Sequence, residues 1–212
     1  MIIKLVQSSL MRFFWITLFI FTFTFSLAFD AEARGNKNYY KANALIYSTV
    51  NTDNIRNGNA DTFYSDADGD AIGLLFIRGE LKDGYRQEAE IIYSETPTEF
   101  SLNSATKVNI KTIHLMQNYL LDFGVTETTN LVFGIGAGAA FHIVNTETST
   151  GDDDNENATL GFNLSAGIDI NEKVEFLARY TNYGEVEGGS RTSGGAPKFD
   201  YETHSLILKY KF

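Results

Sequence analysis

Along most of this chain, apolar residues recur at every second position, which is the period of a β-strand and not of a helix. The clearest stretch runs from Leu131 to Val144, where Leu, Phe and Ile alternate with Gly, Ala, Val and His. Successive strand side chains point to opposite faces, so one face of this strand is large and apolar. The other face is small or polar, and a helix would mix the two sets around its surface.

The alternation recurs often enough to predict about eight strands. It is clear over Tyr85–Ser94, Leu160–Ile170, Val174–Thr181 and Ser205–Phe212, and weaker over 39–50, 70–78 and 107–122. Short connections near 79–84, 123–129 and 170–173 alternate with long polar ones near 51–69, 95–106, 145–157 and 184–198.

This rhythm of short and long connections is typical of transmembrane β-barrels, whose periplasmic turns are short and whose external loops are long. We therefore expect an all-β fold: a closed antiparallel transmembrane β-barrel of about eight strands in an up-and-down meander. It would carry four longer acidic loops outside the cell, with both mature termini in the periplasm.

The N-terminus has the features of a signal peptide. Lys4 and Arg12 precede an apolar run that ends at Ala28, and small residues flank two potential cleavage sites. We expect residues 1–33 to be removed after Ala33, with cleavage after Ala28 as the alternative, leaving 34–212 as an outer-membrane β-barrel domain. A transmembrane anchor is disfavoured because the run is short of about 20 residues and no basic cluster follows it.

The two strand faces suggest which side meets lipid. The interior of an eight-stranded barrel is only just wide enough to be filled by side chains, so bulky rings belong outside and small or charged residues inside. Buried charges need partners of opposite sign, and the inner set supplies both. The expected interior charges are Arg86, Glu88, Glu90, Asp169, Glu175, Arg179, Lys209 and Lys211.

Tyrosines gather near the predicted strand ends. Amphipathic rings favour the membrane interface, so these residues predict aromatic girdles around the barrel. The set is Tyr39, Tyr40, Tyr93, Tyr119, Tyr180, Tyr183, Tyr201 and Tyr210.

Composition and charge exclude several kinds of chemistry. The net charge of −10 argues against nucleic acid as a partner, because phosphate binding needs clustered Lys and Arg. There is no cysteine, hence no disulfide or thiolate metal site. Gly134, Gly136 and Gly138 follow the strand period and are not a phosphate loop. We expect no cofactor-binding and no metal-binding residues, and ion binding by the acidic loops is left open.

Three histidines, His114, His142 and His204, are the candidates for catalysis. A hydrolase needs a nucleophile, a base and an orienting group within reach of one another. His204 is next to Ser205, but adjacent strand residues face opposite sides. The chain is therefore not expected to be an enzyme, and a lipid-modifying barrel is the least favoured alternative.

The Gly-rich strand 132–138, the strands 161–167 and 174–180, and the last strand 204–212 together resemble opacity-protein-like surface antigens and the barrel domain of outer-membrane protein A. The resemblance implies the outer membrane of a Gram-negative-type bacterium. It also implies that Leu206, Leu208, Tyr210 and Phe212 form the signal read by the barrel-assembly machinery. These families carry a Gly a few residues before the end, where this chain has Leu or Lys.

Three kinds of function remain open from sequence. The first is a structural or surface-interaction protein whose loops contact lipopolysaccharide or an extracellular ligand, since binding is usual on loops held by a rigid scaffold. The second is a small, narrow or gated diffusion pore. The third is the outer-membrane lipid-modifying enzyme, and the fold alone does not choose among these three. A soluble, lipocalin-like barrel is a fourth possibility, and it predicts that the mature chain stays in solution without detergent.

Overall fold

The computed structural model describes residues 38–57, 60–63, 67–82, 84–96, 100–103, 106–148, 151–189 and 196–212. The predicted signal segment 1–33, with both possible cleavage sites, lies outside the described residues. The chain divides into two units, Met1–Tyr39 and Tyr40–Phe212, and the fold below is that of the second unit with the first residue of its first strand.

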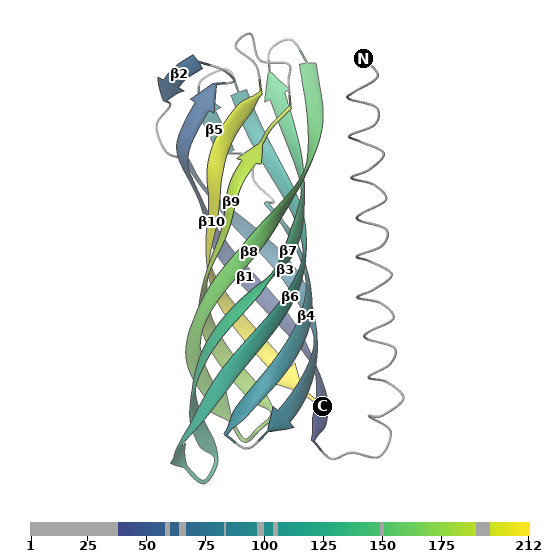
Figure 1. Ribbon diagram of the computed structural model, residues 1–212, viewed down its shortest axis with the longest axis vertical. Helices are drawn as coiled ribbons and strands as arrows, with labels where there is room; N and C mark the ends of the chain where they lie inside the picture. The colour runs from purple at the N-terminus through teal and green to yellow at the C-terminus, as the bar shows by residue number, and fades with distance from the viewer. Residues whose placement is uncertain are drawn as a thin grey trace. The chain divides into compact units, whose positions relative to one another are not determined.

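Eight long strands form a closed ring in which each pairs with its neighbours in chain order (Figure 1). Two short strands, β2 and β5, pair with β1 and β6 off the ring. No helix among the described residues is long and apolar enough to cross a membrane. The predicted meander of about eight strands is thus confirmed. The strands are β1 (Tyr39–Asn57), β2 (Ala60–Phe63), β3 (Ala67–Lys82), β4 (Tyr85–Glu95), β5 (Phe100–Asn103), β6 (Thr106–Thr126), β7 (Thr129–Thr148), β8 (Gly151–Ile170), β9 (Val174–Glu187) and β10 (Pro197–Lys211).

The first and last strands close the ring. β1 and β10 pair antiparallel from Ala42↔Lys211 to Asn57↔Pro197. Beyond this ladder, the backbones of Lys41 and Phe212 exchange two hydrogen bonds of 3.1 and 2.8 Å. A closed ring leaves no strand edge along this seam, which an open sheet would expose.

Tight connections gather at one end of the barrel, here called the turn end. They join Lys82 to Tyr85, Thr126 to Thr129 and Ile170 to Val174. In the last, the Lys173 N–H donates to the Ile170 carbonyl over 3.2 Å. Asn171 and Glu172 both have positive φ, 55° and 57°, which makes this a type I′ turn.

The opposite end, here called the hairpin end, differs from the prediction of four long loops. The segment 145–157 is not a loop: β7 and β8 stay paired to Thr148↔Gly151. Likewise β1 and β3 extend into 51–69, β5 and β6 into 95–106, and β9 and β10 into 184–198. The apolar alternation stops where the outward face becomes polar, but the backbone ladder continues past that point.

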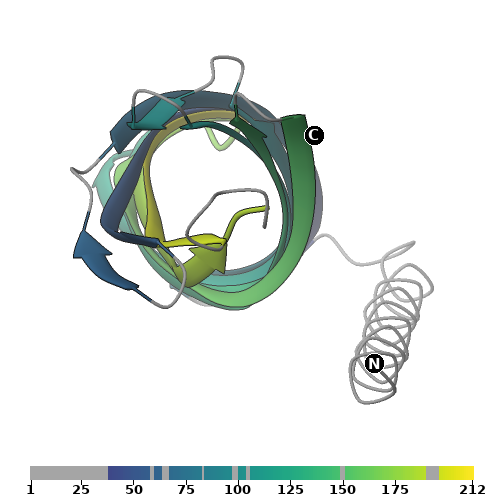
Figure 2. The same cartoon turned by 90° about the horizontal axis from the view of Figure 1, so that it is seen from above.

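One bulge bends the hairpin end of β9. Asp200 pairs with Glu185 and Glu202 pairs with Asn182, so two β9 residues, Tyr183 and Gly184, oppose a single β10 residue. Gly184 has φ of +72°, a region that glycine enters without steric cost, and bulges bend the strand that carries them. Beyond this point the β9–β10 end lies inside the ring of strands when viewed from above (Figure 2).

Replacing Glu172 with glycine should stabilise the folded barrel by about 1 kcal/mol, because a non-glycine residue at positive φ is strained. The folded fraction on unboiled gels, followed through a urea series, measures the change. Asn171→Gly is the matched control and should move the urea midpoint less, because asparagine already tolerates this region. Equal midpoints for Glu172→Gly and the unaltered chain would contradict the expectation.

Candidate functional site

The outer face of the barrel is apolar over its middle. On β8, the outward residues from Leu160 to Ile170 are large or small apolar side chains, and most are well exposed. That length matches the roughly 9 to 11 residues with which a tilted strand crosses a bilayer. All eight ring strands contribute to this apolar band. Its prominent members are Leu45, Leu74, Phe76, Ile91, Ile113, Leu121, Phe133, Ile135, Leu160, Phe162, Leu164, Ile168, Phe176, Leu206 and Leu208.

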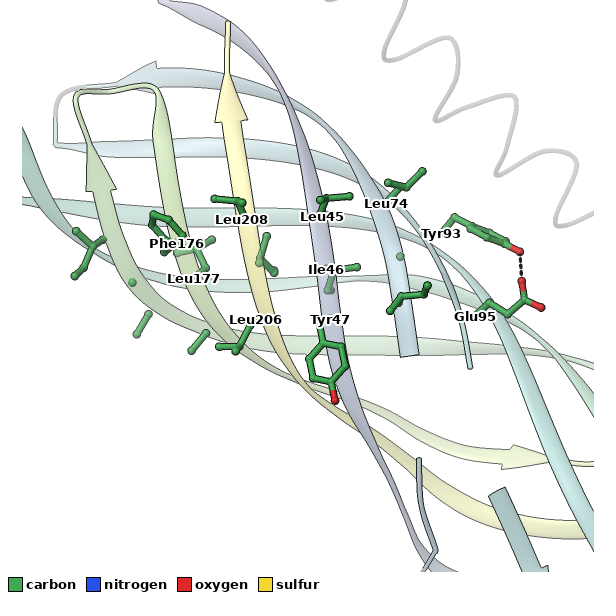
Figure 3. Close-up of a pocket in the computed structure, with 17 residues that line it drawn as sticks. Leu45, Ile46, Tyr47, Leu74, Tyr93, Glu95, Phe176, Leu177, Leu206 and Leu208 are labelled. Carbon is green, nitrogen blue, oxygen red and sulfur yellow. Dashed lines mark hydrogen bonds between the residues drawn. The ribbon is translucent and has the colours of Figure 1, made fainter. Parts of the chain in front are cut away.

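One hollow on the barrel lies in this apolar band and not at a cluster of chemical groups. It has a volume of about 890 Å³, and its walls are almost entirely apolar side chains from β1, β3, β4, β8, β9 and β10 (Figure 3). Its lining includes small residues, among them Ala166 and Ala178, as well as larger side chains such as Phe176 and Leu206. Such a surface suits acyl chains, and it offers no grouping of polar atoms for catalysis.

Tyrosines mark the border of the band toward the hairpin end. The hydroxyls of Tyr47 and Tyr93 donate to Asp70 and Glu95 over 2.8 and 2.9 Å, the second of which is drawn in Figure 3. The Tyr180 hydroxyl donates to Glu202 over 2.7 Å. Each of these rings is half in the apolar band and half on polar groups, the arrangement expected at a membrane interface.

Three of the tyrosines expected in these girdles face inward instead. Tyr183 and Tyr201 are buried inside the barrel, and Tyr40 contacts the interior charges. The prediction of girdle positions is therefore wrong for these three residues. Strand parity decides the matter: each alternates with outward neighbours, so its ring must point into the barrel.

The eight residues expected as interior charges all have buried side chains on the inner face. Four are cations and four are carboxylates. They come from β4, β8, β9 and β10. Each lies in the middle of its strand or in the part that is nearest the turn end of the barrel. Burying charge is costly unless partners compensate it, so the distances between these groups are decisive.

Lys209 is the centre of this charged cluster. Its Nζ lies 2.7 Å from Glu88 Oε2 on β4 and 2.7 Å from Glu175 Oε1 on the neighbouring strand β9. All three side chains are fully buried. One ammonium thus joins opposite sides of the ring.

Two further cations complete the compensation around Glu175. The Nη1 of Arg86 lies 2.6 Å from Glu175 Oε2, and its Nε and Nη2 donate to both oxygens of Asp122 over 2.7 and 2.8 Å. Lys211 contacts Asp169 at 2.6 Å and Glu175 at 3.4 Å. Asp122 on β6, which the sequence did not single out, is therefore a member of the cluster.

A second ion pair crosses the barrel one step further from the turn end. The guanidinium of Arg179 on β9 holds both oxygens of Glu90 on β4, over 2.6 and 2.9 Å. This two-pronged geometry is the strongest form of arginine–carboxylate pair. Beside it, the Asn163 amide donates to Asn118 over 2.8 Å, and the hydroxyls of Ser48 and Ser205 lie 2.7 Å apart.

Above the ion pairs lies an aromatic cluster that sequence reasoning missed. The ring nitrogens of His142 are hydrogen-bonded to Thr112 and Thr159, over 3.0 and 2.9 Å. The Tyr183 hydroxyl is hydrogen-bonded to His114 over 2.6 Å, and the rings of Tyr183 and Tyr201 stack with centroids 5.1 Å apart. The alternation of strand residues places His114 and His142 on the inner face, and this pattern could have predicted the cluster from sequence.

Apolar side chains close the interior at the hairpin end. Phe199 and Val186, from the inward β9–β10 end, are completely or almost completely buried. They pack with residues of four other strands into one cluster. Its remaining members are Val50, Ala71, Val108, Ile110, Ala140, Val144, Tyr183 and Tyr201.

His204 and Ser205 lie on opposite faces of β10. The His204 ring contacts the Tyr180 ring on the outside, while Ser205 bonds to Ser48 inside. Over the part of the chain that the structure describes, no group of His, Cys, Asp or Glu side chains is arranged to hold a metal ion. The arrangement of these residues supplies no nucleophile with its base.

The four residues of the expected assembly signal all point outward. Leu206, Leu208, Tyr210 and Phe212 follow one another along β10 and its end, and the Tyr210 and Phe212 rings stack at 6.5 Å. They form the apolar outer face of the strand that closes the ring. Recognition by an assembly machinery stays a prediction.

Replacing Lys209 with methionine should destabilise the barrel by about 3–5 kcal/mol, because Glu88 and Glu175 would then be buried without their shared cation. The urea midpoint of the folded gel band measures the loss. Lys198→Met is the matched control: its contacts with Glu185 and Glu187, at 3.8 and 3.5 Å, are exposed, so its effect should be small. Similar losses of stability in the two variants would show that the barrel does not depend on the buried charge of Lys209.

No protein-family model matches the chain, and no curated protein sequence matches it. Solved structures do. The chain is similar to Neisserial surface protein A, with 12% identity and a TM-score of 0.49 over 83% of this chain and 98% of that chain.

Two further solved structures are similar. One is Ail, the attachment invasion locus protein of Yersinia pestis, with 12% identity, a TM-score of 0.45, and 82% of this chain and 99% of that chain covered. The other is the N-terminal β-barrel domain of Pseudomonas aeruginosa OprF, with 13% identity, a TM-score of 0.44, and 82% and 98% covered. These likenesses concern the fold alone.

Proposed function

We propose that this chain is a closed outer-membrane β-barrel that anchors an acidic, strand-built hairpin end at the cell surface as a structural or surface-interaction protein. The observation that carries the proposal is the inverted distribution of side chains. Leucine and phenylalanine cover the outside of the ring, while paired lysine, arginine and carboxylates fill its inside. The proposal assigns no catalytic role to the chain.

The inverted faces support lipid over water as the surroundings. A soluble, lipocalin-like barrel points its apolar face inward, and a soluble protein rarely exposes a continuous apolar patch of more than a few hundred Å². Here the apolar band runs around every ring strand, with Leu160 at 68% and Leu206 at 65% exposure. Closure of the ring satisfies the backbone without water, as lipid requires.

The filled interior supports a closed barrel over an open pore. The inward side chains at both levels are shielded from water: Glu88 and Lys209 at the charged cluster, and Phe199 and Val144 at the apolar one. A continuous water path would leave these side chains accessible. A narrow or gated pore is therefore the second candidate, and it requires movement of both levels.

The negative charge on the outward face of the hairpin end supports a role at the cell surface. Beyond the apolar band, the outward face of β8 carries Asp152, Asp154 and Glu156, and its partner strand carries Glu147. In outer-membrane barrels the longer connections face the outside. A ligand for this face would be cationic, or would be lipopolysaccharide held through divalent ions, and charge complementarity would guide its approach. Insertion of the barrel by an assembly machinery would use the outward residues at the end of the chain, Leu206, Leu208, Tyr210 and Phe212.

Cysteine labelling of intact cells should reveal the orientation, because the chain has no cysteine of its own. Glu156→Cys, at the hairpin end, should react with a membrane-impermeant maleimide on whole cells. Gly84→Cys, in a turn at the opposite end, should react only after lysis. If Gly84→Cys alone reacted on whole cells, the turn end and not the hairpin end would face the outside. Protein found outside the outer-membrane fraction, without a heat-dependent gel shift, would refute the anchor itself.

Planar-bilayer recordings should give no stable conductance steps for the purified protein, because ion pairs and apolar side chains both block the interior. Lys209→Met is the informative comparison, since it weakens only the charged level and should still conduct nothing. Reproducible steps from the unaltered protein would favour the pore over the closed anchor.

A further inference from the structure

The wall of the barrel has a seam between β8 and β9 at the hairpin end. The ladder between these strands runs from Ile170↔Val174 to Phe162↔Asn182 and goes no further. β8 itself continues, paired with β7, as far as Gly151. The bulge at Tyr183 and Gly184 is the cause, because it bends β9 inward just where the ladder ends.

Two asparagine side chains span this seam. The Asn157 amide donates to the Glu187 carbonyl over 2.6 Å and accepts from the Glu187 N–H over 3.0 Å. The Asn155 amide donates to the same carbonyl over 3.0 Å. Over the rest of the β8–β9 boundary backbone bonds to backbone, but here side chains replace the ladder.

The end of β9 from Gly184, with Gly188 and Gly189, and the start of β10 up to Asp200 are here called the margin. The margin covers the interior, and the two asparagines hold its β8 side. Val186 and Phe199 pack onto Val144 and its neighbours, and the Gly189 N–H donates to Thr146 Oγ1 over 2.9 Å. On its other side the margin is continuous with the wall, because β10 stays paired with β1 up to Asn57↔Pro197. Among the described residues, asparagine side chains hold the β8 side of the margin, where a backbone ladder holds the β1 side.

We propose that this margin, Gly184–Glu187 of β9 with the following Gly188 and Gly189, and Pro197–Asp200 of β10, is a lid that opens along the β8 seam when Glu187 leaves Asn155 and Asn157. The lid goes beyond the proposed anchor, which needs only a closed barrel. Opening exposes the apolar layer and the His142–Tyr201 cluster beneath it, while the ion pairs further down still block the barrel.

The edge of β8 offers the open lid a place to bind. Counted past the bulge, outward Glu185 and Glu187 align with outward Leu160 and Ala158, and inward Val186 aligns with inward Thr159. The faces therefore match for a backbone ladder. Two arrangements of the same margin are available: one latched over the mouth by asparagines, and one paired into the wall.

Thiol accessibility beneath the lid tests this inference in the folded protein in detergent micelles. Val144→Cys places a probe in the apolar layer, and Leu120→Cys places one near the ion pairs; both positions are fully buried. A buried thiol reacts with a soluble maleimide only through opening, so the rate reports the open population. Adding Asn155→Ala and Asn157→Ala should raise the Val144→Cys rate at least about tenfold and leave the Leu120→Cys rate unchanged.

Control variants separate a lid from general loosening. Asn145→Ala removes another asparagine bond at the hairpin end, to Asp154, that takes no part in the latch, and it should leave both rates unchanged. Gly184→Ala has room for its Cβ but strains the positive φ, and it should also raise the Val144→Cys rate alone. The lid would be overturned in favour of a fixed plug if the Val144→Cys rate stayed unchanged both in the Asn155→Ala, Asn157→Ala variant and in Gly184→Ala. Equal increases at both probes would overturn it in favour of global loosening. Neither result would bear on membrane anchoring, which localisation and conductance measure.

Discussion

The small interior of an eight-stranded ring constrains where the charged side chains of the described wall lie. Side chains must fill that space completely, and lipid outside rejects ionised groups, so the charges turn inward and must balance. Four buried cations meet four buried carboxylates there. The fifth carboxylate, Asp122, keeps 20% of its side chain exposed, so the excess negative charge stays in contact with water.

The interior changes character along its length. Reading inward-facing residues along β10 from the turn end, Lys211 and Lys209 give way to Ile207, and further on to Tyr201 and Phe199. One end of the barrel is therefore stabilised by electrostatic pairing across the ring, and the other by burial of apolar and aromatic surface. The hydrophobic contribution that stabilises the hairpin end weakens on cooling.

Sequence pattern predicts most of the wall and little of the hairpin end. Where lipid imposes alternation, as over Leu131–Ile143, strand, face and interior charges follow from period two. Past Glu156 toward the hairpin end, water replaces lipid and the apolar signal disappears, so a paired strand looks like an acidic loop. The bulge at Gly184 could not be located, because a glycine in a strand is compatible with both regular and bulged backbone. The partners of Lys209 depend on distances across the ring, which local spacing does not encode.

The pairing of β1 with β10 also sets the order of events in making the molecule. Ala42 meets Lys211, so the two ends of the barrel sequence are in register with each other. Such contact between segments far apart in the sequence is slow to form. Until then the chain carries two unsatisfied strand edges, which are prone to aggregate. Pairing of β1 with β10 is therefore the step that removes these exposed edges and completes the wall.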